Sequence, residues 1–530
     1  MTPPQQSGPE QSQTQQGGPT TLVEPTTLRE RIAQLIVIRI GSNLPPITRV
    51  HEDEARVAAE LDRGPVGGLL LFNGTWPETR ETLARLQDSV TTPMLVASDI
   101  ERGAGQQIAG LALFPHQRAF VDLPDAADAV ARFCQVTAAE AHAAGVHATF
   151  GPVADVNSDP RNPIIATRAF GDDTERASEL VVSYVCAAEE AGLLTCAKHF
   201  PGHGDTHQDS HDAMPRVQAS RETLDHRELA PFRAAIDAGV SMLMTAHVEY
   251  PSLDPSGSPA TLSHAILIDL LRDELGFQGV VCSDSLLMAG VRERFANEGE
   301  LAVATLSAGV DWLLDVVDHV EVVDAIERAV ENGRLSVERV DEAFGRVWAM
   351  KQRAFAHTPP AASDEDKQAT AAAEAERIAA KATRVLADRA GVLPLDAGQG
   401  VTALVLKPHH RPTDPSEQPL AGALRDRFAA VRYFETGPEV EASLADDLLA
   451  GTPDGQPIVV AMIVKPAAWH AFGLTESQDA LIRRLMTERP VILACLGVEN
   501  ALDRYPDAAA KLVTHSDVPV SQRALAAALV

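Results

Sequence analysis

Lysine is nearly missing from the first two thirds of this chain, where arginine carries almost all of the positive charge. Lys198 is the only lysine before Lys351 in a sequence of 530 residues. An ammonium is a compact point charge, whereas a guanidinium is planar and forked. The isolated lysine therefore indicates that this position needs a point charge.

Positive charge is scarce throughout, with 45 Lys and Arg residues against 74 Asp and Glu and a formal net charge of −29. This balance argues against nucleic acid and anionic membrane as partners. No apolar run reaches the roughly 20 residues that span a bilayer, so we expect no membrane insertion. Five scattered cysteines, an odd number, indicate reduced thiols and not a disulfide framework.

The first twenty residues are rich in Gln, Pro, Ser, Gly and Thr, and they lack the apolar segment of a signal peptide. We expect a disordered tail over residues 1–24 and a cytoplasmic protein.

Short apolar runs alternate with amphipathic helical patterns from residue 27 onward. The segment TLRERIAQLIV (27–37) predicts a helix with a capping box formed by Thr27 and Glu30. Apolar strands that alternate with helices over about 320 residues favour a TIM-like (β/α) barrel, which we place at residues 25–353. The predicted strands are 66–72, 93–99, 147–156, 193–199, 241–247, 279–284 and 310–315.

Residues 354–376 are rich in Pro, Ala and acidic side chains and predict a linker that passes into a helix. A second series of alternating strands and helices then predicts a smaller α/β sandwich domain over 377–530. It contains no Walker loop and no G-x-G-x-x-G fingerprint, so we expect no cofactor and a structural or substrate-bordering role. Its predicted strands are 401–407, 429–435, 457–464, 490–497 and 511–517.

Ionisable residues end nearly every predicted barrel strand. The carboxyl ends of barrel strands converge on one face, where active sites lie, so we expect these side chains to meet. Helix capping would explain Asp99 or Asp315 singly, but it explains the Lys198–His199 pair poorly. The residues are Asp99, Asp155, Lys198, His199, His247, Asp284 and Asp315.

The densest polar stretch is CAKHFPGHGDTHQDSH (196–211), with a histidine at every fourth position from 199. On one helix this spacing would suit a metal, but Pro201, Gly202 and Gly204 interrupt any helix there, so we expect a loop without metal. Asp209 could orient His211, whose imidazole can exchange a proton near neutral pH. Asp284, after an apolar strand, suits a nucleophile or an electrostatic stabiliser, and a nucleophilic carboxylate with an acid/base group is the minimal set for retaining glycoside hydrolysis.

At these residues the chain resembles the family 3 glycoside hydrolases, specifically the β-N-acetylglucosaminidase branch, over about residues 27–350. The resemblance is carried by KHFPGHG followed by four residues and DSH, by FGPVADVNSDPRNPIIATRAFG (150–171) and by LGFQGVVCSDSLLM (275–288). It implies a cytoplasmic exo-enzyme that removes terminal β-linked N-acetylglucosamine with retention from peptidoglycan- or chitin-derived oligosaccharides.

The resemblance also implies a role for each matching residue. Asp284 corresponds to the nucleophile, His211 to the acid/base, and Asp209 to the carboxylate that orients His211. Residues that correspond to sugar ligands are Asp99, Arg168, Lys198 and His199; for Arg168 a structural ion pair is the alternative. Asp155 and His247 are expected to support these residues, and Asp205 and His203 to shape the loop.

Two positions depart from the family pattern. Gln107 stands where an arginine is expected after the second strand, with Arg102 as a possible substitute, and Ser285 stands where an Asp commonly follows the nucleophile. Other functions remain open: a β-N-acetylglucosaminide phosphorylase or a β-glucosidase of the same family, a metal-dependent barrel hydrolase, and a non-catalytic sugar-binding protein.

Overall fold

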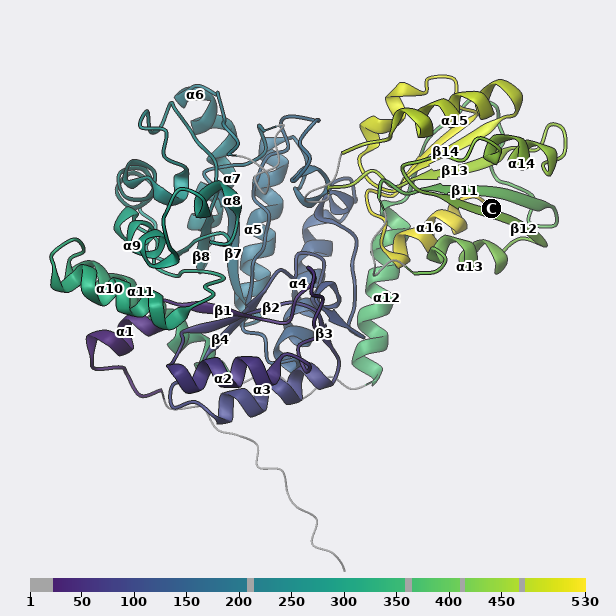
Figure 1. The fold of residues 1–530 in the computed structure, drawn as a ribbon. Helices are drawn as coiled ribbons and strands as arrows, with labels where there is room; N and C mark the ends of the chain where they lie inside the picture. Colours follow the sequence, from purple (N-terminus) through teal and green to yellow (C-terminus); the bar gives the residue numbers. More distant parts are fainter. Residues whose placement is uncertain (1–21, 207–213, 358–364, 410–414, 467–471) are drawn as a thin grey trace, which may run out of the picture.

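Two sheets, built mainly from parallel strands joined by helices, organise the chain (Figure 1). The computed structural model describes residues 22–206, 214–357, 365–409, 415–466 and 472–530.

The first sheet follows the apolar runs predicted as strands, and all of its neighbouring strands are parallel. Their side chains are almost all buried, because the sheet is covered on both faces, and this burial explains the continuously apolar sequence. In spatial order the strands are β1 (Val37–Ile40), β2 (Gly68–Leu71), β4 (Leu95–Ser98), β6 (Ala148–Thr149), β7 (Leu194–Phe200), β8 (Met242–Thr245) and β9 (Val280–Cys282). The short strands β3 (Gly74–Thr75) and β5 (Ile108–Ala109) pair separately.

Helix α1 (Leu28–Gln34) begins at the predicted capping box of Thr27 and Glu30. It ends before residue 37, where the prediction was wrong, because Val37 already pairs with Gly68 as the first residue of β1. The other helices of this region are α2 (Glu54–Arg63), α3 (Glu78–Asp88), α4 (Ala126–Ala143), α5 (Thr174–Glu190), α6 (Arg221–Thr223), α7 (Ala230–Asp237), a π-helical segment (Ala265–Glu274), α8 (Ala289–Arg292), α9 (Glu298–Ala308), α10 (His319–Glu331) and α11 (Val337–Ala356).

Residues 311–315 close the sheet into a ring. Trp312 bridges to Cys282 in β9, and Leu313 bridges to Ile36, directly before β1. The Val37 amide donates to the Leu313 carbonyl oxygen at 3.0 Å, and the Leu313 amide donates to the Leu35 carbonyl oxygen at 2.8 Å. This segment makes single bridges and not the regular strand predicted over 310–315, yet it occupies the eighth position of the ring. The predicted (β/α) barrel is confirmed.

The second sheet has helices on both faces, so the predicted α/β sandwich is also confirmed. Helices α13 (Pro419–Arg425) and α16 (Pro519–Ala528) pack on one face, and α14 (Leu444–Ala450) and α15 (Glu476–Glu488) pack on the other. One strand was missed: β10, which runs antiparallel to its neighbour. The spatial order is β10 (Arg384–Asp388), β15 (Ala510–Val513), β14 (Val491–Cys495), β13 (Ile458–Met462), β11 (Gly400–Leu406) and β12 (Ala430–Thr436).

Helix α12 (Glu365–Ala382) connects the two regions and crosses the predicted linker boundary at residue 376. Its buried alanines pack in the barrel's hydrophobic core together with residues of α16. The loops after the second domain's strands also contact the barrel, where His116 Nδ1 lies 2.8 Å from Ser516 Oγ. The carboxyl ends of the second sheet therefore border the barrel.

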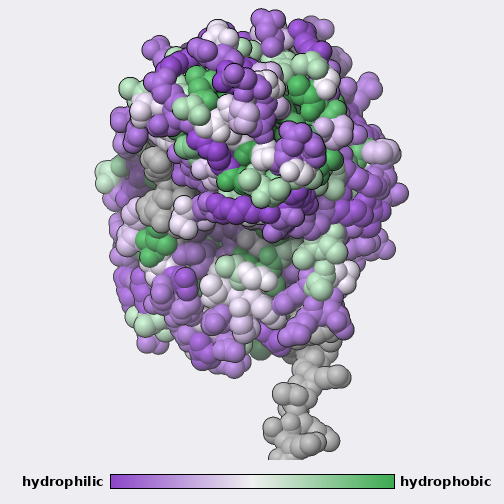
Figure 2. Space-filling model, turned by 90° about the vertical axis from the view of Figure 1, so that its right-hand side faces the viewer, coloured by the Kyte–Doolittle hydropathy of each residue, from purple (hydrophilic) through white to green (hydrophobic). Residues whose placement is uncertain are grey.

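Hydrophilic residues cover most of the face in Figure 2, with apolar residues in separate groups among them. In the part of the chain that the structure describes, no helix is both long enough and apolar enough to cross a bilayer.

Candidate active site

A cavity of about 410 Å³ lies at the carboxyl ends of the barrel strands, and this volume is typical of small-molecule sites. Three carboxylates lie in its wall: Asp99 follows β4, Asp284 follows β9, and Asp315 ends the closing segment. The remaining wall residues are Arg39, Asn43, Leu44, Leu70, Phe72, Phe150, Met244, Ser285, Leu287, Met288 and Leu314. Strand-end carboxylates that are up to 216 residues apart in the sequence thus share one cavity.

Asp284 lies in the turn after β9, and its Oδ1 accepts a hydrogen bond from the Ser285 amide at 2.7 Å. Burial acts to raise the pKa of Asp284, but the imidazoles of His247 and His199, the Ser285 amide and the Lys198 ammonium together lower the pKa below its ordinary value. Asp284 is therefore anionic at neutral pH, with Oδ2 left for another contact. This is the state that a nucleophilic carboxylate requires.

Ser285, the departure from the family pattern, links Asp284 to a second carboxylate. Its Oγ donates to Asp315 Oδ2 at 2.6 Å. Asp315 is in turn held by the Arg39 guanidinium, whose Nε donates to Asp315 Oδ1 at 2.9 Å, and which lies over the Phe72 ring. Asp315 has a positive φ of 68°, which is uncommon for a residue other than glycine, and it lines the cavity. Sequence reasoning noted Asp315 as a strand end but did not include it or Arg39 among the site residues.

Lys198 joins Asp99 to a buried acidic residue that the sequence analysis did not single out. Its Nζ lies 2.6 Å from Asp99 Oδ1 and 2.7 Å from Glu101 Oε1. Burial acts to lower the pKa of Lys198, but the two carboxylates raise it above its ordinary value, so the ammonium is retained. The signal for Glu101 was available: it lies two residues after Asp99, near the end of the same strand.

Arg168 binds the same acidic residue in a forked pair, with Nη2 2.7 Å from Glu101 Oε1 and Nε 3.0 Å from Glu101 Oε2. This geometry matches the ion-pair alternative, and the role of Arg168 as a sugar ligand stays a prediction. Burial acts to raise the pKa of Glu101, but Arg168 and Lys198 hold that pKa well below its ordinary value.

His199 is fixed by Asp155, as expected of a supporting carboxylate. Asp155 accepts from the His199 amide at 3.0 Å and lies 2.7 Å from His199 Nδ1. An ionised carboxylate only accepts, so the proton is on Nδ1, and Nε2 is left for another contact. The His203 amide also donates to Asp155, at 2.7 Å, and His203 Nδ1 lies 3.0 Å from Thr206 Oγ1, so His203 helps to shape the loop.

His247 supports the turn that carries Asp284, since its Nε2 lies 3.0 Å from the Ser285 carbonyl oxygen. Asp209 and His211 lie outside the described residues, so their predicted roles stay predictions. Among the residues that the structure does describe, no group of three or more His, Cys, Asp or Glu side chains could hold a metal ion.

Gln107, the other departure, supports Asp99: its Nε2 donates to the Asp99 carbonyl oxygen at 3.3 Å, and its Oε1 accepts from Asn43 at 2.8 Å. Arg102 is not among the residues that line the cavity. Its side chain contacts Gln106, and its charge helps to lower the pKa of Asp517 in the second domain. Its role as a substitute for the missing arginine stays a prediction.

Comparison with known proteins agrees with this arrangement. The chain is 32% identical over 381 residues to β-hexosaminidase A of Pseudoalteromonas piscicida, and 32% identical over 354 residues to a β-N-acetylglucosaminidase/β-glucosidase of Cellulomonas fimi. The matches cover 65% and 63% of this chain but only 63% and 62% of those proteins.

A solved family 3 β-N-acetylglucosaminidase from Paenibacillus shares the fold with a TM-score of 0.82 at 30% identity, covering 95% of this chain and 97% of that one. A β-glucoside phosphorylase also shares the fold, with a TM-score of 0.83 at 22% identity over 95% of this chain and 92% of that one. The model of the glycosyl hydrolase family 3 N-terminal domain matches residues 27–350. The chain belongs to glycosyl hydrolase family 3.

Proposed function

We propose that this chain is a retaining exo-β-N-acetylglucosaminidase that hydrolyses terminal β-linked N-acetylglucosamine from peptidoglycan- or chitin-derived oligosaccharides. The observation that carries the proposal is Asp284, an anionic carboxylate with one oxygen held by Ser285, in the wall of a sugar-sized cavity. Two relatives and one solved structure are named as hexosaminidases or N-acetylglucosaminidases, one of them also as a β-glucosidase, and these names support the N-acetyl specificity.

In the first step, Asp284 Oδ2 attacks the anomeric carbon as the bond to the leaving oxygen breaks. His211, oriented by Asp209, gives its proton to that oxygen. In the second step, water attacks the same carbon and returns a proton to His211, and the bond to Asp284 breaks. Two inversions at one carbon give net retention.

Asp99 in the cavity wall and the residues behind it would position the sugar. Asp99 accepts hydroxyl hydrogen bonds, and Lys198 holds Asp99 in place and has one N–H that neither Asp99 nor Glu101 uses. His199 has its Nδ1 engaged by Asp155 and offers Nε2 to substrate. Arg168 would support these residues by holding Glu101, the carboxylate that also pairs with Lys198.

A chromogenic β-N-acetylglucosaminide, assayed beside the matching β-glucoside, tests the proposal. We expect hydrolysis of the N-acetyl substrate, and Asp284→Ala and His211→Ala should each lower kcat by about 10³-fold or more. Asp269→Ala and His264→Ala, at barrel positions with side chains 67% and 64% exposed, serve as matched controls with parental activity.

Full activity of Asp284→Ala would refute the mechanism. Parallel assays with inorganic phosphate distinguish hydrolysis from phosphorolysis, since a phosphorylase releases a sugar 1-phosphate. Preference for the glucoside would identify a β-glucosidase, and full activity after chelation would exclude a metal-dependent reaction. A parent chain that binds N-acetylglucosamine without turnover would be a binding protein.

A further inference from the structure

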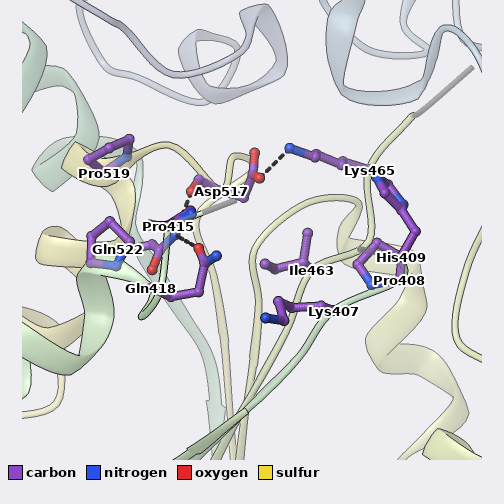
Figure 3. Close-up of a pocket in the computed structure, with 11 residues that line it drawn as sticks. Lys407, Pro408, His409, Pro415, Gln418, Ile463, Lys465, Asp517, Pro519 and Gln522 are labelled. Carbon is purple, nitrogen blue, oxygen red and sulfur yellow. Dashed lines mark hydrogen bonds and ion pairs between the residues drawn. The ribbon is translucent and has the colours of Figure 1, made fainter. Parts of the chain in front are cut away.

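A second cavity, of about 170 Å³, lies in the α/β sandwich domain and not in the barrel (Figure 3). Its wall comes from the residues after β11 and β13 and from the segment that leads into α16. The described residues that line it are Lys407, Pro408, His409, Pro415, Gln418, Pro419, Ile463, Lys465, Asp517, Pro519 and Gln522.

The cavity lies where the strand order of the sheet reverses. From β11 the chain continues to β12 on one side, and it then returns to β13 on the other side of β11. The loops that follow β11 and β13 therefore leave the sheet in opposite directions, and a crevice remains between them. Ligands of open parallel sheets bind in this crevice, at the carboxyl ends of the strands.

Lysine is concentrated at this crevice. The whole chain has seven lysines, and both Lys407 and Lys465 line the cavity, with side chains only 14% and 15% exposed. The Lys407 ammonium pairs with Glu435 Oε2 at 2.9 Å, and the Lys465 ammonium pairs with Asp517. Burying an ammonium costs free energy even when it is paired with a carboxylate. Because two of the seven lysines lie at this one crevice, we infer that their positive charge serves a function there.

An amide supplies a third donor, and its orientation is fixed by its neighbours. The Leu420 amide donates to Gln522 Oε1 at 3.0 Å, so the nitrogen end of Gln522 is the end that donates to Gln418 Oε1, also at 3.0 Å. The amide nitrogen of Gln418 is thereby left to face the cavity. Figure 3 shows the nitrogen ends of Gln418, Lys407 and Lys465 facing the space that the labelled residues surround.

We propose that this crevice binds a small molecule through an anionic oxygen group, a phosphate or a carboxylate. Ammonium and amide N–H groups are the donors that such oxygens accept. The proline rings and Ile463 supply an apolar wall for the rest of the molecule. A cation fits poorly, because the described lining residues include two ammonium groups, Lys407 and Lys465, but a single carboxylate, Asp517, which already pairs with Lys465.

Calorimetric titration of the full chain with inorganic phosphate, glucose 6-phosphate and lactate tests the site. We expect at least one of these anions to bind, and Lys407→Met to weaken its binding by about tenfold or more, the effect of losing one charge-assisted hydrogen bond. Lys381→Met removes an exposed lysine of α12 that pairs with Asp125, and it should leave the affinity unchanged. The preferred anion tells a phosphate site from a carboxylate site.

Phosphate could instead bind in the barrel, so the titrations are repeated with saturating N-acetylglucosamine, which should not compete. Four results would each overturn the proposal. They are competition between N-acetylglucosamine and the anion, unchanged affinity in Lys407→Met, equal losses of affinity in both lysine variants, and no binding of any of the three anions. If Lys407→Met does not fold, Gln418→Met leaves both ion pairs in place and should weaken binding by about threefold. None of these outcomes depends on whether the barrel is a hexosaminidase.

Discussion

In the barrel the strands close into a ring, and residues from distant strands, such as Asp99 and Asp315, meet in one cavity. In the second domain the sheet stays open, and polar side chains after its strands share a cavity at the crevice between β11 and β13. Both regions place charged residues at the carboxyl ends of parallel strands. The closure of the sheet therefore decides how many of these residues can act on the same ligand.

The ion pairs at the two cavities also differ in how many charged residues they connect. In the barrel, Glu101 is shared by Lys198 and Arg168, so three charges depend on one another. In the second domain, Lys407 is the one cation that pairs with Glu435 among the residues that the structure describes. Removing one member of a buried network leaves several charges uncompensated, and this should cost more than breaking a single pair.

The largest expected effect tests that difference. Glu101→Gln should lower the free energy of unfolding by about 3 kcal/mol, because it leaves two buried cations short of a partner. Glu435→Gln should cost about 1 kcal/mol, because it replaces the ion pair with Lys407 by a neutral hydrogen bond and keeps an oxygen that can accept from Tyr433 and the Gln418 amide. Urea denaturation at pH 7 measures both. Equal losses in the two variants would contradict the comparison.

The effect of Glu101→Gln should also depend on pH. The pKa of Glu101 in the folded chain lies well below its ordinary value of 4.5, so its contribution to stability is complete above that pH. As the pH falls below about 4.5, Glu101 takes up a proton in the unfolded chain but not in the folded chain. The contribution of Glu101 to the free energy of unfolding is then progressively lost. The difference between parent and variant should therefore shrink between about pH 5 and pH 3.

A second buried lysine provides a contrast within the barrel region. Lys351 on α11 is fully buried. Among the described residues, its ammonium donates a hydrogen bond to an uncharged amide oxygen, that of Gln34. Burial lowers the pKa of Lys351 to about 7, whereas the carboxylates around Lys198 raise the pKa of that lysine.

Lys351→Met should therefore raise the free energy of unfolding by about 2 kcal/mol at pH 7, because a buried ammonium without a carboxylate destabilises the fold. The gain should shrink as the pH rises toward about 10, where the unfolded chain also loses its proton. Lys198→Met should destabilise at pH 7. Thermal and urea denaturation of both variants check the signs, and the same sign for both would break the contrast.

The smallest expected effect concerns the link between two carboxylates of the barrel cavity. Ser285→Ala removes the hydrogen bond from Ser285 Oγ to Asp315 but keeps the amide that binds Asp284. We expect kcat to fall by about tenfold with little change in KM, since Asp284, the proposed nucleophile, is less well positioned. Ser307→Ala, which removes a hydroxyl bonded to the Val303 carbonyl on α9, is the control. A change in KM alone would indicate a role in binding.

Much of this fold was predictable because local patterns determine it. Buried parallel strands read as apolar runs, the capping box of Thr27 and Glu30 marks a helix start, and a polar residue after a strand marks the barrel face. The contacts of Glu101, Arg39 and Asp315 were not predictable. Each depends on which strand ends become neighbours when the ring closes, and the sequence contains no local signal for that pairing.

The bond between Arg39 and Asp315 joins residues that are 276 positions apart. One lies in the first strand of the barrel and the other in the segment that closes it, and through Ser285 this bond reaches the turn that carries Asp284. A chain still being synthesised, or one cleaved anywhere between these positions and separated, lacks one side of the site. Enzymatic activity should therefore require a closed barrel ring, and chains that lack either Arg39 or Asp315 should stay inactive.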